Sequence, residues 1–74
     1  MKPKEKLFDV VVYFNETHIV ESVAGVNMRL STGHYNAERR FDTLLGRINL
    51  DKFSPAIVPA GRYKVGDKLA PRHR

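Results

Sequence analysis

Residues 7–14, with the sequence LFDVVVYF, constrain the fold more than any other part of this chain. The stretch is rich in β-branched and aromatic residues, which favour a β-strand. One set of alternate positions is entirely apolar, and the other is apolar except for Asp9. A strand that is apolar on both faces has to be covered on both faces. The sequence therefore predicts a strand with packing partners on each side of its sheet.

Several shorter runs accompany this strand. The polar residues 15–17 separate it from a β-rich run at 18–24, which predicts a hairpin. Gly25 interrupts the pattern, and residues 26–30 alternate as in a short strand or an extended crossing segment. The C-terminal part offers three more short runs between Pro- and Gly-containing turns: 56–58, 62–65 and 68–70.

One helix is expected between these two groups of strands. Phe41, Leu44, Leu45 and Ile48 recur at the spacing of a single helix face. Side chains that suit the two helix ends also flank the stripe: Thr32 or Asn36 at the start and Asn49 at the end. The resulting helix of about 14–17 residues is long enough to cover one face of a small sheet.

The predicted fold is α+β, a small antiparallel sheet of about four strands in the order β-β-(β)-α-β-β with one helix on one face. Because a single helix leaves the other face open, we expect a homo-oligomer, with a dimer as the first choice. A single domain is expected over residues 7–70. The flanking residues 1–6 and 71–74 are expected to be flexible basic ends.

Composition excludes several classes of protein. The chain of 74 residues has no cysteine, so disulfides and thiolate metal sites are impossible. His18, His34 and His73 lack the paired spacing of a structural zinc site, so neither a metal nor another cofactor is expected. There is no apolar run of about 18 residues and no signal-peptide pattern, which predicts a cytoplasmic protein without a membrane span.

An enzyme is not expected, and no catalytic residue is assigned. The best candidate pair is Asp9 and Glu21, which could face each other across the hairpin as two carboxylates. Catalysis by such a pair requires a cleft, and a chain of this length has little room for one.

The segment TGHYNAERRF, residues 32–41, contains the most unusual local feature. Arg39 and Arg40 lie near the start of the helix, where the helix dipole disfavours positive charge. Free N–H groups at a helix start and arginine forks both suit phosphate or carboxylate. The neighbouring residues add further donors, a ring and a flexible backbone: Gly33, His34, Tyr35 and Asn36. The combination predicts a phosphate or nucleotide pocket, although it matches no established phosphate motif.

The same arginines also fit an ordinary charged helix face. Arg39 could pair with Glu38 or Asp42, or with a carboxylate elsewhere in the fold, and Tyr35 could belong to the apolar stripe. Both interpretations remain open at the level of sequence.

The formal net charge of +5 allows attraction to nucleic acid, a nucleotide or an acidic host protein. Arg62, Tyr63 and Lys64 interleave charge with an aromatic ring, as nucleic-acid-binding surfaces do. In a dimer, Arg62 or Lys64 of either chain could complete the pocket at the helix start. No helix-turn-helix, zinc-finger or RNP-type pattern accompanies these residues.

The stretches TGHYNAERRFDTLLGRIN and SPAIVPAGRYKVGDKL resemble the small accessory proteins of bacteriophages and prophages, over roughly residues 8–69. The resemblance implies a compact non-enzymatic protein in a bacterial cytosol, often one that binds or blocks a host component. The expected function is accordingly a small binding protein that grips an anionic ligand at its helix start. The alternative is a protein–protein inhibitor or adaptor that acts through a sheet edge or an apolar face.

Overall fold

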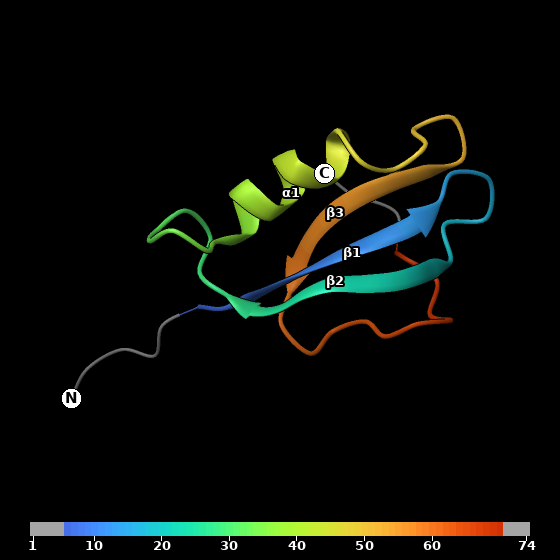
Figure 1. Cartoon of the computed structure of the whole chain (residues 1–74). Helices are drawn as coiled ribbons and strands as arrows, with labels where there is room; N and C mark the ends of the chain where they lie inside the picture. Colours follow the sequence, from blue (N-terminus) through green and yellow to red (C-terminus); the bar gives the residue numbers. More distant parts are fainter. Residues whose placement is uncertain (1–5, 71–74) are drawn as a thin grey trace.

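The computed structural model describes residues 6–70 and confirms an α+β fold with one helix and an antiparallel sheet (Figure 1). The elements, in chain order, are β1 (Phe8–Phe14), β2 (Val20–Met28), α1 (Ala37–Leu45) and β3 (Phe53–Pro59). The sheet has three strands in the order β2-β1-β3, so β1 is central. The predicted flexible ends lie outside the described residues, except for residue 6. Within the described part, no helix is both long enough and apolar enough to cross a membrane.

The central strand is covered on both faces, as its sequence requires. Val10 and Val11 point to opposite faces, and both are fully buried. The helix α1 lies across one face of the sheet (Figure 1). On the opposite face, Tyr63 and Leu69 pack against a cluster that contains Val11. The C-terminal segment of the same chain therefore covers part of the face that a second subunit was expected to cover, and the dimer stays a prediction.

The C-terminal segment is held in place through the start of β2. The Val20 N–H donates to Asp67 O at 2.8 Å, and Val20 O accepts from the Gly66 N–H at 2.9 Å. Leu69 N–H donates to His18 O at 2.8 Å. Of the predicted last strands, only a single bridge forms, between Ile19 and Lys68, and residues 62–65 are not a strand.

The strand β2 continues through Gly25, where the sequence suggested a break. Its pairing with β1 shifts register three times, so β2 accommodates extra residues as bulges. An ideal Cβ at Gly25 would collide with the Met28 side chain and lie 3.7 Å from Arg40 Cγ. Glycine at this position therefore leaves room for the Met28 side chain of the same strand and for Arg40 of α1.

Asp9 is the buried carboxylate of β1, with an exposed fraction of 4%. Its Oδ1 accepts from the Asn27 N–H and its Oδ2 from the Gly61 N–H, both at 2.9 Å. The predicted pairing of Asp9 with Glu21 is wrong, because the register places Glu21 beside the other end of β1. Asp9 instead ties a bulge of β2 and the turn after β3 to the central strand.

The helix is shorter than predicted. It spans nine residues, about 13–14 Å, and its N-cap is Asn36, one of the two predicted caps. Gly46 ends it, with an N–H bonded to the carbonyls of Leu44 and Thr43. Glycine has a low helix propensity, so the chain leaves the helix here and not at Asn49, although Ile48 is still half-buried.

The outer edge of β3 is nearly devoid of hydrogen-bond donors. The Ala60 N–H donates to Leu7 O, and the Asn15 N–H donates to Lys52 O. These two bonds show which β3 residues direct their N–H and carbonyl groups toward β1. The residues whose backbone hydrogen-bonding positions face away from β1 are therefore Phe53, Pro55, Ile57 and Pro59.

Both prolines lack an N–H, and the Phe53 N–H donates to Asn49 O at 2.9 Å. Among the described residues, Ile57 alone keeps an unpartnered N–H and carbonyl on this edge. Such an edge resists pairing with another strand.

Candidate anion-binding site

Asn36 organises the loop that leads into α1. It is buried, with an exposed fraction of 4% and an extended backbone conformation. Its Oδ1 accepts from the Arg39 N–H at 2.9 Å, and its Nδ2 donates to Gly33 O at 2.8 Å. Gly33 has a φ of 87°, which strains any residue with a side chain. The Asn36 side chain therefore holds the loop against the start of the helix.

The N–H groups of the first helical turn are already used. Ala37 N–H donates to Arg29 O at 2.7 Å, and Glu38 N–H donates to Leu30 O at 3.0 Å. The third, from Arg39, binds the cap side chain. The predicted use of free N–H groups at the helix start is therefore wrong, and an anion here has to be held by other groups, chiefly the side chains.

Side chains of the loop and the helix surround a hollow of about 330 Å³. Five of its lining residues were predicted from the sequence: His34, Tyr35, Asn36, Arg39 and Arg40. Two others, Met28 and Thr43, were missed. Thr43 follows Arg39 by one helical turn, a spacing that could have revealed it, whereas Met28 comes from β2 and only the tertiary fold brings it here.

The hollow carries two guanidinium groups without acidic partners. Neither Arg39 nor Arg40 forms an ion pair with a carboxylate among residues 6–70. The neighbouring helical acids, Glu38 and Asp42, are exposed and do not bridge to them. The alternative interpretation, in which Arg39 pairs with one of these two acids, is therefore wrong. Tyr35 is 83% exposed and does not join the apolar stripe.

The other predicted residues lie apart from this hollow. Gly33 shapes the loop through its carbonyl but does not line the hollow. Arg62 lines a different hollow, with its guanidinium carbon 5.9 Å from the centre of the Tyr63 ring. The exposed Lys64 donates its N–H to Asp67 Oδ2 at 3.0 Å. Within one chain, Arg62 and Lys64 cannot complete the site at the helix start.

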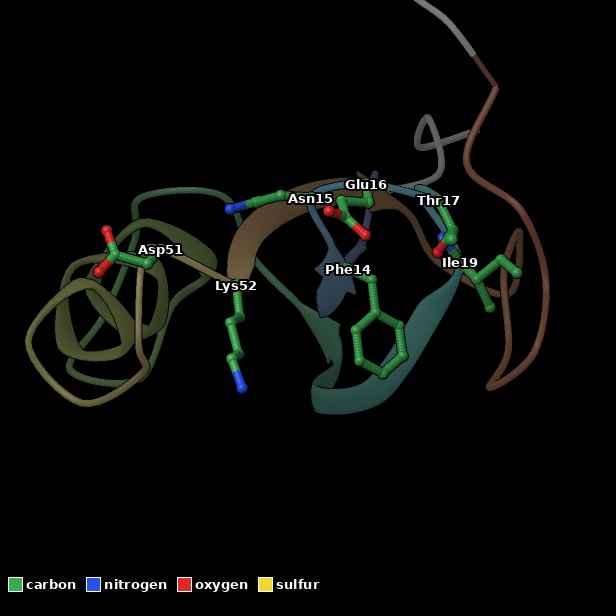
Figure 2. Close-up of a pocket in the computed structure, with 7 residues that line it drawn as sticks. All are labelled: Phe14, Asn15, Glu16, Thr17, Ile19, Asp51 and Lys52. Carbon is green, nitrogen blue, oxygen red and sulfur yellow. The ribbon is translucent and has the colours of Figure 1, made fainter.

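A second hollow, of about 480 Å³, lies at the turn between β1 and β2, and the sequence did not predict it. It is lined by Phe14, Asn15, Glu16, Thr17, Ile19, Asp51 and Lys52. Figure 2 shows the Phe14 ring and the Lys52 chain extending in the same direction, while the Asp51 carboxylate points away. The exposed Phe14 ring packs against Phe53 at 5.1 Å between centres. Alternation in the sequence had assigned Phe14 to a covered face.

No set of three potential metal ligands comes together in the described part of the chain. Comparison of the chain with protein-family models, curated proteins and solved structures finds no match. The chemistry of the hollows is therefore the guide to function.

Proposed function

We propose that this chain is a small non-enzymatic binding protein of the cytoplasm that holds a phosphate-bearing ligand, a nucleotide or a nucleic-acid backbone. The ligand occupies the hollow at the start of α1, where Arg39 and Arg40 supply the charge. The observation that carries this proposal is that two guanidinium groups share one hollow without a carboxylate partner in the described chain.

The surroundings of the arginines favour phosphate. Guanidinium groups bind phosphate through two parallel hydrogen bonds, and His34 can add another donor. The exposed Tyr35 ring offers a surface on which a base can stack. A cytoplasmic binding protein of this kind also agrees with the resemblance to phage accessory proteins.

The sheet edges are poor alternatives for binding a protein partner. Prolines remove outward donors from β3, bulges distort β2, and the C-terminal segment occupies the start of the β2 edge. Pairing with an external strand needs a regular row of free N–H and carbonyl groups. An adaptor that works by strand addition is therefore disfavoured.

Replacing both arginines is expected to weaken binding to a labelled single-stranded oligonucleotide of mixed sequence. Hydrogen bonds to charged groups contribute about 1.5–3 kcal/mol each, so Arg39→Gln/Arg40→Gln should raise Kd about tenfold or more. Fluorescence anisotropy between about 50 and 200 mM salt measures the effect. The double variant should also show a shallower salt dependence, by about 0.7 in logarithmic slope for each lost phosphate contact.

The matched control is Arg47→Gln, which removes an exposed arginine outside the hollow and should leave Kd nearly unchanged. Titration with inorganic pyrophosphate, followed by NMR, distinguishes a phosphate site from one that needs the polymer. An unchanged Kd in a folded double variant, with the same salt slope, contradicts the proposal.

A second candidate function, docking of a host protein, is favoured by the hollow at the β1–β2 turn. Phe14 is 39% exposed there, and Ile19 is 36% exposed. Asn15 Nδ2 donates to the carbonyl of Leu50, another exposed apolar residue, at 3.0 Å. Apolar side chains gathered at one end of a small protein are typical of protein docking sites.

For this candidate, Phe14→Thr is expected to abolish salt-resistant capture of proteins from a bacterial lysate, because it removes the apolar wall of the hollow. Pull-down at low and high salt provides the measurement. Tyr35→Thr is the control. Tyr35 is more exposed than Phe14, but it lines the hollow of Arg39 and Arg40, which we call the arginine hollow. Equal capture by the Phe14→Thr variant and the wild type excludes this surface.

A further inference from the structure

A third hollow, of about 550 Å³, lies along the outer side of β3 and serves neither of the sites above. Five consecutive β3 residues, 55–59, line it, so its wall includes the backbone edge of the strand. Four segments contribute rings to it, through Tyr13, His18, Phe41 and Tyr63. We call this hollow the β3 groove.

Two tyrosine rings, those of Tyr13 and Tyr63, are among the walls of the β3 groove. Tyr13 projects from the same face of the sheet as Ala56, and its ring meets His18 edge-on at 5.6 Å. Tyr63 is held by the Ala70 N–H, which donates to its hydroxyl at 3.3 Å. Ala56, a small residue, lies in the wall of the groove and is half-buried. Rings around a small residue suit a flat aromatic ligand.

The strand edge adds hydrogen-bonding groups to this space. Ile57 presents an N–H and a carbonyl away from β1, and neither has a partner among the described residues. The prolines on each side prevent a longer ladder, so an extended peptide gains only one residue's pair of bonds. A donor and an acceptor side by side match the edge of a nucleobase, which presents both kinds of group.

The charge of the β3 groove favours a ligand with an anionic group. No aspartate or glutamate lines it, and Arg62 does. The guanidinium of Arg62 lies near the Tyr63 ring, so charge and ring are adjacent. A cation beside an aromatic space complements a phosphate attached to a base.

From these observations we propose that the β3 groove binds a nucleotide, with the base between the Tyr13 and Tyr63 rings against Ile57 and the phosphate at Arg62. This site is separate from the arginine hollow of α1 and does not depend on the function proposed for it. A chain with both sites holds a nucleotide in the β3 groove and a phosphate-bearing ligand beside Arg39 and Arg40.

The test is an NMR titration of the full chain with adenosine and uridine monophosphates. Saturable shifts are expected at the amides of Ala56, Ile57 and Tyr63. Adenosine alone should shift the same amides more weakly, and inorganic phosphate alone should leave them unmoved. Tyr13→Leu should raise Kd about fivefold or more, the loss expected for one base–aromatic stack.

Two matched pairs of variants separate this site from the arginine hollow. Arg62→Gln should remove the advantage of nucleotide over nucleoside, whereas Lys64→Gln, two residues away and outside the groove, should not. Both positions are exposed, so these variants keep the fold even if Tyr13→Leu does not. Tyr35→Leu should leave shifts in the β3 groove unchanged.

Loss of nucleotide binding only in Tyr35→Leu or the Arg39/Arg40 double variant overturns the groove proposal and leaves the proposed function standing. Unchanged affinity in both Tyr13→Leu and Arg62→Gln overturns it as well. Tighter binding of a proline-rich peptide than of either nucleotide at the same amides overturns it in favour of a peptide groove.

Discussion

Asp9→Ala is expected to unfold most of the protein at room temperature. The carboxylate accepts two backbone N–H groups, from Asn27 and Gly61, in a position that is 4% exposed. Hydrogen bonds to a charged acceptor contribute about 1.5–3 kcal/mol each, and both donors would lose their partner. The expected loss of about 3–6 kcal/mol is comparable to the whole stability of a domain of this size, about 3–5 kcal/mol.

Urea denaturation followed by circular dichroism measures this loss. Asp9→Asn should be less severe, because the amide keeps one acceptor while its NH₂ group opposes the other donor. Asp42→Ala is the matched control, since that aspartate is exposed on α1 and makes no side-chain hydrogen bond within the described chain. Its effect should stay within about 0.5 kcal/mol. A similarly small effect of Asp9→Ala would disprove the role assigned to this carboxylate.

Leu69→Asp is expected to lower the free energy of unfolding by about 2–4 kcal/mol. Leu69 packs against the buried valines of the sheet face opposite α1, and a carboxylate there loses both apolar contact and hydration. Val65→Asp, in the same segment, replaces a residue that is 62% exposed and should change little. Urea denaturation of the two variants provides the comparison.

The dependence of the unfolding midpoint on protein concentration shows whether the same chain or a second subunit covers this face. If Leu69 of the same chain covers the face, the unfolding midpoint of the wild type is independent of concentration. A midpoint that rises with concentration, together with an unaffected Leu69→Asp variant, would return the dimer as the cover of this face.

The sequence predicted the features of the fold that depend on local chemistry. The central strand followed from a run that is apolar on both faces, and the helix followed from its stripe and from the cap at Asn36. The path of β2 through Gly25 could not be foreseen, because the bulges exist only in pairing with β1. The cover by Tyr63 and Leu69 was also missed, since short runs between turns do not show where they pack.

The candidate sites divide in the same way. The arginine hollow was largely predictable, because one loop and two helical turns supply nearly all of its residues. Its backbone hydrogen bonds were not predictable. The N–H groups at the helix start donate to the carbonyls of Arg29 and Leu30, and these contacts depend on how the loop folds back. The β3 groove joins Tyr13, Ala56 and Tyr63 from separate segments, and no spacing in the sequence links them.

The position of β1 between its two neighbours has a kinetic consequence. Phe8 pairs with Met28 on one side and with Pro59 on the other, so one partner strand is near in sequence and the other is distant. The β1–β2 hairpin can form within microseconds, whereas docking of β3 must first close a loop that contains the whole helix. Pairing between distant strands slows folding relative to a chain with only local contacts. Until β3 docks, the valines of the hairpin remain open to water, and self-association competes with folding as the chain becomes more concentrated.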